Sequence, residues 1–232
     1  MRGEVHIWRV HMDIPSAMAA RVYTVLSEDE RERLARLASE RDQQRFIVAH
    51  GALRDVLARY LEVTPSRVEY VHNPSGKPAL DPGFGSPLRF NLSHSGALAL
   101  IAIAMDADVG VDVECVRAHR DYSEIARWFF SAAEAEYLAS VPYAEHAEAF
   151  IRCWTRKEAF LKARGDGLTA VLDGLPLTFT TGAAEDAVEL QSPASGRWSI
   201  HTLRPAPGYI GALAVEGGDW RVTESKWEMP RD

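Results

Sequence analysis

The five residues G-V-D-V-E, Gly110 to Glu114, have the alternation of a short β-strand that carries two acids on one face. Side chains two residues apart in a strand point to the same side, so Asp112 and Glu114 are expected to lie next to each other. Two neighbouring carboxylates repel unless something positive lies between them. Solvent at a strand edge, an arginine or a metal ion would each relieve the repulsion, and this segment alone does not distinguish them.

A second group of charged residues lies in C-W-T-R-K-E-A-F-L-K-A, later in the chain. With helical spacing, Trp154, Glu158, Leu161 and Lys162 share one face. The simplest interpretation of Glu158 and Lys162 is an exposed salt bridge, which contributes about 0.2–0.5 kcal/mol. The strand Asp112 to Glu114 could likewise be a solvated edge.

Taken together, these residues indicate a different chemistry. Asp112, Glu114 and Glu158 are three carboxylates with no cysteine or histidine cluster beside them. An all-oxygen site of this kind suits Mg²⁺, which keeps waters and takes further ligands from substrate phosphates. A nearby lysine, Lys162, is a natural partner for a phosphate or for a leaving oxygen.

The elements that position these residues follow from periodicity and turn signals. Each half of the chain begins with a strand, continues with helices and ends in a strand meander, so we expect an α+β fold. We predict two similar lobes with a pseudo-two-fold relation, residues 1–106 and 107–232, each an antiparallel sheet packed by helices, with the active site between them. One chain would then suffice as a monomer. The main predicted strands are Val5–Val10, Phe90–Ser95, Ala97–Ala104, 177–181, 188–190, 198–203 and 209–215; the main predicted helices start at Ser27, Asp42, Ser123, Ser131 and Ala144.

Composition limits the class of protein without identifying its chemistry. The 232 residues carry a net charge of −7, which argues against a general nucleic-acid binder but allows one local basic pocket. No apolar stretch approaches membrane-spanning length, and no signal peptide is evident at the start. The cysteines Cys115 and Cys153 lack metal-type spacing, which favours a reduced, cytoplasmic protein. We expect the polar tail after Asp219 to be loosely held.

G-V-D-V-E, followed by W-T-R-K-E-A-F-L-K-A-R-G-D-G-L, resembles the paired signature of the 4′-phosphopantetheinyl transferases, in particular the two-lobed type that activates peptide and polyketide synthetases. F-N-L-S-H-S (Phe90–Ser95), G-K-P (Gly76–Pro78) and F-F-S-A-A-E (Phe129–Glu134) extend the resemblance in the family's order. It implies a holo-[acyl-carrier-protein] synthase activity. Such an enzyme moves the 4′-phosphopantetheine arm of coenzyme A onto a serine of an apo acyl, peptidyl or polyketide carrier protein and releases adenosine 3′,5′-bisphosphate.

The resemblance also implies roles for the charged residues. Asp112, Glu114 and Glu158 would hold Mg²⁺, or Mn²⁺, against the pyrophosphate of coenzyme A. Glu158 or a metal-bound water would take the proton of the serine, and these two possibilities stay open. Lys162 would bind the coenzyme and stabilise or protonate the departing phosphate.

Several basic residues match the positions where the family contacts coenzyme A. Ser93 and His94 match its S-H pair, and Lys77 lies in a turn framed by glycine and proline, where a backbone can approach a nucleotide. In the family, the helical segment after Ser27 supplies basic contacts to the 3′-phosphate, and the resemblance implies that arginines do so here. Arginine suits phosphate binding through two parallel hydrogen bonds, and the candidates are Arg45 first, then Arg33, with Arg31 and Arg36 also available. A core histidine, an ordinary loop lysine and a solvated helix face are the alternative interpretations.

Glu134 has two interpretations that the sequence leaves open. S-A-A-E, Ser131 to Glu134, is a capping box, in which the glutamate bonds back to the backbone of the serine. The resemblance instead implies a glutamate near the waters of the metal. Two other functions also remain possible: a coenzyme A-binding module without turnover, and a structural protein whose charged pairs are surface salt bridges.

Overall fold

The computed structural model describes residues 3–117, 122–165, 187–192 and 196–229. The first of its two four-stranded sheets contains β1 (Glu4–His11), β4 (Leu88–Ser95), β5 (Leu98–Met105) and β10 (Arg221–Lys226). Their spatial order is β10-β1-β5-β4. All neighbours are antiparallel except β1 and β10, which are parallel.

The second sheet contains β6 (Val109–Cys115), β7 (Ala187–Ser192), β8 (Gly196–Leu203) and β9 (Tyr209–Glu216). It is antiparallel throughout, in the order β6-β9-β8-β7. The order β6-β9-β8 repeats the order β1-β5-β4: in both, an opening strand lies beside the second strand of a hairpin. The predicted α+β fold with antiparallel sheets is confirmed, while the boundary of the lobes at residue 106 stays a prediction.

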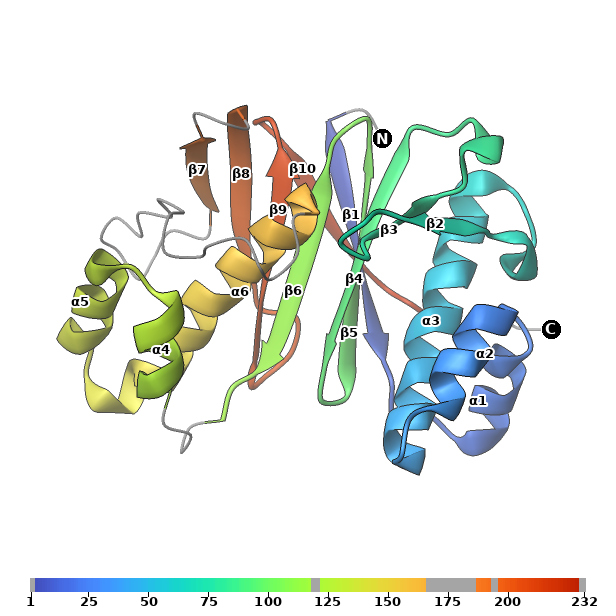
Figure 1. Ribbon diagram of the computed structural model, residues 1–232, viewed down its shortest axis with the longest axis horizontal. Coiled ribbons are helices and arrows are strands. Elements are labelled where there is room, and N and C mark those ends of the chain that lie inside the picture. The colour runs from blue at the N-terminus through green and yellow to red at the C-terminus, as the bar shows by residue number, and fades with distance from the viewer. Residues whose placement is uncertain (1–2, 118–121, 166–186, 193–195, 230–232) are drawn as a thin grey trace.

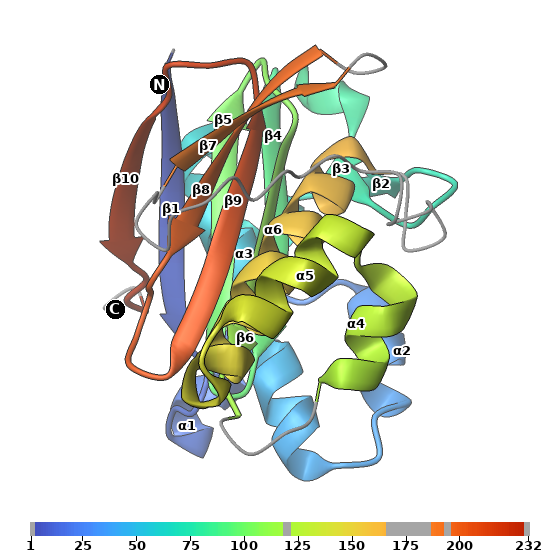
Figure 2. The same cartoon turned by 90° about the vertical axis from the view of Figure 1, so that its left-hand side faces the viewer.

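Figure 1 shows one group of helices at the right-hand end of the molecule and a second group that begins at the left-hand end and reaches back across the second sheet; Figure 2 views the second group from its own side. One group contains α1 (Ser16–Tyr23), α2 (Glu28–Ala35) and α3 (Glu40–Leu61). Helices α1 and α3 form a core with one face of the first sheet, and α2 packs against α3. The other group contains α4 (Ser123–Phe129), α5 (Ala132–Ser140) and α6 (His146–Arg164). The short strands β2 (Tyr70–His72) and β3 (Pro78–Leu80) form a separate antiparallel pair. None of the helices in these parts of the chain is long and apolar enough to cross a membrane.

The strand β6 has the two different faces that its alternation predicted. Val109, Val111 and Val113 are fully buried in a core cluster that also contains residues of β1 and β5. Side chains of the intervening residues therefore point to the other side, toward β4 and α6. The helix α6 ends at Gly165, whose φ of 74° is the left-handed conformation expected of a glycine cap.

Up to residue 229, the polar tail is not loosely held, and the expectation was wrong for these residues. Residues Arg221 to Lys226 form β10, which adds to the edge of the first sheet beside β1. The next residue, Trp227, is buried, and its Nε1 donates a hydrogen bond of 2.8 Å to Oδ2 of Asp55 on α3. The partners of this strand lie at the other end of the chain, so local sequence carries little signal for the pairing. Helix α1 was also not predicted, and the predicted strand 177–181 lies outside the described residues.

Candidate active site

The site lies where the edge strands of the two sheets face each other. The strand β4 is the last strand of the first sheet and β6 is the first strand of the second. Asn91 Oδ1 accepts a hydrogen bond of 2.9 Å from the amide of Val111. Ser93 Oγ donates to Asp112 Oδ1 at 2.8 Å, and Ser95 Oγ donates to Glu114 Oε2 at 2.7 Å. Side chains thus bridge the two edges, and both acids are held on the face that looks toward β4. The bridging side chains come from alternate positions of β4: Asn91, Ser93 and Ser95.

Helix α6 brings Glu158 and Lys162 to this gap. The helix lies directly on β6 at Gly110, where a Cβ would come within 2.1 Å of the carbonyl oxygen of Ala159. This close approach lets Lys162 Nζ donate hydrogen bonds to Asp112 Oδ1 at 2.6 Å and to Ser93 Oγ at 3.0 Å. The predicted acids and lysine are therefore gathered from β6 and α6.

The charged forms of the buried carboxylates are disfavoured in this arrangement. Burial raises the pKa of Glu158 to about 7, and the neighbouring charges of Asp112 and Glu114 add to the rise while Lys162 opposes it. Burial likewise raises the pKa of Glu114, against the hydrogen bond from Ser95. Among the residues that the structure describes, Asp112 Oδ2 and Glu158 Oε1 are buried and have no hydrogen-bond partner. Because these buried carboxylate oxygens lack donors, the site favours the binding of a cation or a proton.

The carboxylates do not form a ready-made metal site. Within the described ranges, no group of three or more His, Cys, Asp or Glu side chains is arranged to hold a metal ion. In the structure, Oδ1 of Asp112 forms an ion pair with the ammonium of Lys162 at 2.6 Å. Grouping of Asp112, Glu114 and Glu158 around one ion stays a prediction.

A cavity of about 320 Å³ opens beside these residues, and Glu158, Lys162 and Lys77 line it. The Nζ of Lys77 donates to the carbonyl oxygen of Ala163 at the end of α6. Burial lowers the pKa of this lysine. Lys77 therefore lies in the same cavity wall as Glu158 and Lys162, and its ammonium is anchored on the helix that carries them. A contact between Lys77 and coenzyme A stays a prediction.

A larger cavity of about 560 Å³ continues from the first, and the two share Gly76, Pro78, Asn91 and Leu92 in their walls. Arg33 and His94 line it, so these two predicted coenzyme ligands face one space. The imidazole of His94 is exposed at the wall yet crowded by protein atoms, which lower its pKa. The charges of Lys162 and Arg45 and the neighbouring imidazole of His50 also act to lower it.

Arg45 is held differently from Arg33. Its guanidinium makes two hydrogen bonds to Asp13, Nε to Oδ1 at 2.9 Å and Nη2 to Oδ2 at 3.0 Å. This pairing raises the pKa of Arg45 and lowers that of Asp13. A direct contact between Arg45 and a phosphate stays a prediction.

The contacts of Glu134 are those of the capping box. The amide of Ser131 donates to Glu134 Oε2 at 2.7 Å, and the amide of Glu134 donates to Ser131 Oγ at 3.3 Å. The same carboxylate forms a buried ion pair with Lys157 Nζ at 2.5 Å, and this lysine also donates to the carbonyl oxygen of Phe129. Glu134 Oε1 is buried without a hydrogen-bond partner, so a place near the metal stays a prediction.

Several residues of the site were missed at the sequence level. Asn91 and Ser95 continue the period of two set by Ser93, and that alternation could have identified them. His50 and His72 line the larger cavity from α3 and β2. As lone histidines without a motif, they gave no local signal.

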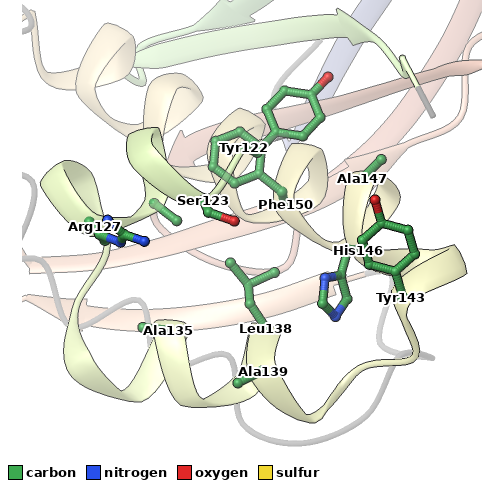
Figure 3. A pocket seen from close by; sticks show the side chains of 11 residues that line it. Tyr122, Ser123, Arg127, Ala135, Leu138, Ala139, Tyr143, His146, Ala147 and Phe150 are labelled. Atoms are coloured by element: carbon green, nitrogen blue, oxygen red, sulfur yellow. The ribbon is translucent and has the colours of Figure 1, made fainter. Parts of the chain in front are cut away.

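A separate cavity of about 330 Å³ lies between α4, α5 and the beginning of α6 (Figure 3). Its wall is mainly aromatic and aliphatic, with Tyr122, Leu138, Tyr143 and Phe150 as the large side chains. The rings of Tyr122 and Phe150 are stacked with centroids 4.4 Å apart. None of the predicted site residues lines this cavity.

Comparison with known proteins agrees with this geometry. Residues 108–221 match the model of the 4′-phosphopantetheinyl transferase superfamily, and residues 14–106 match that of the 4′-phosphopantetheinyl transferase N-terminal region. The chain is 38% identical over 222 residues to the 4′-phosphopantetheinyl transferase HetI of Nostoc sp., covering 95% of this chain and 91% of HetI. It is 28% identical over 218 residues to the 4′-phosphopantetheinyl transferase Sfp of Bacillus subtilis, covering 92% and 93% of the two chains. The chain belongs to the 4′-phosphopantetheinyl transferase superfamily.

Proposed function

We propose that this protein transfers the 4′-phosphopantetheine arm of coenzyme A to a serine hydroxyl of an apo carrier protein and releases adenosine 3′,5′-bisphosphate. The observation that carries the proposal is the position of Asp112. Its carboxylate accepts hydrogen bonds from Ser93 and Lys162. Lys162 and the buried Glu158 line a cavity that continues into a larger one, where Arg33 and His94 form part of the wall. This arrangement suits a substrate with a reacting phosphate at one end and a phosphorylated nucleoside at the other.

The shape of the two cavities supports one orientation of coenzyme A. The pyrophosphate would lie in the smaller cavity, where the ammonium groups of Lys77 and Lys162 can neutralise it. The adenosine would extend into the larger cavity, toward Arg33 and His94. The phosphopantetheine phosphorus would then lie next to Glu158, where an incoming serine can reach it.

The residues supply the proton transfers of the reaction. The serine oxygen forms a bond to the phosphorus of the phosphopantetheine arm, and the bond from that phosphorus to the bridging pyrophosphate oxygen breaks. In the metal-free protein, burial raises the pKa of Glu158 to about 7, so this carboxylate can hold a proton there, and it would accept the proton of the serine. Lys162 is placed to stabilise or protonate the departing phosphate oxygen.

The donor set fits Mg²⁺. Asp112 Oδ2 and Glu158 Oε1 are buried oxygens without partners, and the pKa of Glu114 is raised in part by its neighbour Asp112. These carboxylates would hold the ion together with oxygens of the pyrophosphate, and Mn²⁺ suits the same ligands. When bound, the ion would neutralise the charge that develops on the pyrophosphate.

The test is a direct measurement of the carrier. The protein is incubated with an apo carrier protein, coenzyme A and Mg²⁺, and the carrier is weighed by mass spectrometry. A gain equal to one phosphopantetheine arm is the expected result. Binding of coenzyme A without any gain, across acyl, peptidyl and polyketide carriers, would instead indicate a coenzyme-binding module. Transfer that survives Asp112→Ala would contradict the metal assignment.

We also infer that the enzyme is cytoplasmic and acts as a monomer. The free cysteines Cys115 and Cys153 support a reducing compartment. Side chains from the edge strands of both sheets and from α6 already meet within the chain, at Ser93, Asp112 and Lys162, so no second chain is needed to bring them together. Light scattering on the purified protein during gel filtration tests the oligomeric state, and a stable dimer would contradict the inference.

A further inference from the structure

The end of β4 carries a serine that the proposed reaction does not use. Ser95 Oγ lies 2.7 Å from Oε2 of Glu114 on β6, and the amide of Cys115, the next residue of β6, lies 3.2 Å from the same Oγ. The two strands belong to separate sheets, with β4 at the end of the first and β6 at the end of the second. One hydroxyl of the first sheet therefore contacts both the backbone and an acid of the second.

The groups around this hydroxyl leave one arrangement for its hydrogen. A backbone amide can only donate, so Ser95 Oγ accepts the hydrogen bond from Cys115. An ionised carboxylate can only accept, so the single hydrogen of the serine goes to Glu114. Because the amide and the carboxylate belong to consecutive residues, the backbone of β6 sets the place of the hydroxyl beside its own acid.

The turn after Ser95 is also fixed from the second sheet. The amide of Ala97 donates a hydrogen bond of 3.1 Å to the hydroxyl of Tyr209 on β9. Gly96 has a φ of 56°, and a Cβ there would come within 2.6 Å of the same hydroxyl oxygen. In the second sheet Tyr209 is the partner of Cys115. The backbone that carries the serine is therefore held against β6 and β9, which restricts where its hydroxyl can lie.

Ser93, two residues earlier, holds its acid in a different way. Its Oγ donates to Asp112 Oδ1 at 2.8 Å and accepts from Lys162 Nζ at 3.0 Å. In the proposed function Lys162 turns to the phosphate, so the contacts of Asp112 change during the reaction. The two hydrogen bonds of the Ser95 hydroxyl do not involve this lysine. The contact with Glu114 can therefore persist when the coenzyme and the ion bind.

We propose that Ser95 is a positioning residue, which holds the carboxylate of Glu114 in the orientation that binds the divalent cation. The inference rests on the proposed function, which assigns Glu114 to the ion. A carboxylate that is already oriented loses less conformational freedom when the ion arrives. The joining of the two sheets does not depend on this serine alone, because Asn91 Oδ1 accepts a hydrogen bond of 2.9 Å from the amide of Val111 across the same edges.

The experiment measures metal binding without turnover. Mn²⁺ is titrated into the protein with coenzyme A and no carrier, and the free ion is followed by electron paramagnetic resonance. We expect the Kd for Mn²⁺ to rise about 10–100-fold in Ser95→Ala, the usual effect of removing a hydrogen-bond partner of a metal ligand. Calorimetric titration with coenzyme A in the presence of a chelator should give the native affinity, because the serine acts on the ion and not on the coenzyme.

Two further variants isolate the hydroxyl. Threonine and valine have nearly the same shape, and only threonine keeps the hydroxyl. Ser95→Thr should therefore bind Mn²⁺ about as tightly as the native protein, and Ser95→Val should bind it as weakly as Ser95→Ala. Ser199→Ala is the matched control: Ser199 is a buried serine of β8 whose Oγ donates to the carbonyl oxygen of Gly217 at 3.0 Å. This control should melt at a lower temperature and keep the native Kd for Mn²⁺.

Several results would overturn the proposal. They are a native Kd for Mn²⁺ in Ser95→Ala, an equal rise in Ser95→Thr and Ser95→Val, and the absence of Mn²⁺ binding by the native protein. Loss of folding in Ser95→Ala and Ser95→Val, with a folded Ser199→Ala, would likewise assign the hydroxyl to the fold as a whole. A native protein that binds Mn²⁺ but transfers nothing to a carrier would refute the proposed function, and the Mn²⁺ titration would still decide the role of Ser95.

Discussion

The Nζ of Lys162 lies 2.6 Å from Oδ1 of Asp112, and the same nitrogen lies 3.0 Å from Oγ of Ser93. One ammonium therefore joins α6 to an acid of β6 and a hydroxyl of β4. It neutralises part of the negative charge that β6 and α6 bring together. In the proposed function this ammonium would turn to the pyrophosphate, and the carboxylates would then be free to hold a divalent cation.

Replacement of this lysine tests its part in the chemistry. In Lys162→Met we expect kcat to fall by about 10²–10³-fold with a smaller change in the KM for coenzyme A, because the leaving oxygen gains charge only as the bond breaks. Steady-state transfer to an apo carrier measures both constants. Lys226→Met, on the exposed side of β10, is the control and keeps full activity. A rise in KM with unchanged kcat would show that Lys162 only binds the coenzyme.

The raised pKa of Glu158 predicts how the stability of the metal-free protein depends on pH. The folded carboxyl has a pKa of about 7 against 4.5 for the ordinary group, so between these values the native state binds more protons than the unfolded state. The free energy of unfolding therefore falls as pH rises from about 4.5 to about 7 and stays low above it, by on the order of 2–3 kcal/mol. Glu158→Gln lacks the titrating carboxyl, so its free energy of unfolding should not show this decrease between about pH 4.5 and pH 7.

Thermal unfolding in the presence of a chelator, at about pH 5 and pH 8, measures the effect. Relative to the native protein, Glu158→Gln should melt several degrees higher at pH 8 and almost equally at pH 5. Saturating Mg²⁺ with coenzyme A should raise the melting temperature of the native protein at pH 8, and raise that of the variant less. A variant that is less stable at pH 8 would contradict the raised pKa.

Parts of the site could be predicted because they depend on local periodicity. The alternation of Val111 and Val113 with Asp112 and Glu114 places both acids on one face, since successive side chains of a strand point to opposite sides. The spacing of Glu158 and Lys162 places both on one face of a helix for the same kind of reason. The structure agrees with both.

What could not be predicted depends on pairings between distant segments. β10 is a short polar strand whose partner is β1, at the opposite end of the chain. His50 of α3 lies beside Glu30 because α2 packs against α3. The periodicity of residues within one helix does not reveal a contact between two helices. In the sequence, Gly110 is only the residue before the acidic alternation of the strand. The structure shows that it allows the close contact between this strand and α6.

The contact between Gly110 and α6 gives a third prediction. A Cβ at Gly110 would come within 2.1 Å of Ala159 O and 2.3 Å of Ala163 N, which are both backbone atoms that no side-chain rotation can move. We expect Gly110→Ala to lower the free energy of unfolding by about 1–3 kcal/mol or more and to displace Glu158 and Lys162 from Asp112. Transfer activity should fall by at least about tenfold at a temperature where the variant is still folded.

Gly196→Ala is the matched control for this substitution. Gly196 has a positive φ of 82°, but nothing lies within 4 Å of the added Cβ. Gly196→Ala should therefore lower the free energy of unfolding by roughly 1–2 kcal/mol, because alanine is strained in this left-handed backbone conformation. It should leave the activity unchanged. Chemical unfolding gives the free energies, and the carrier assay gives the rates. Full activity in a stable Gly110→Ala would mean that α6 does not need this close approach.

The two interpretations of Glu134 make opposite predictions. In Glu134→Gln the amide can keep the capping box with Ser131, but the buried ion pair with Lys157 is lost. If the role is structural, the free energy of unfolding falls by about 3–5 kcal/mol and the double variant Glu134→Gln/Lys157→Met recovers most of it, because the unpaired buried charge is gone. The kcat of the folded double variant and the Mg²⁺ concentration for half-maximal transfer then match those of the native enzyme. A double variant that is stable but needs much more Mg²⁺ would place Glu134 near the metal instead.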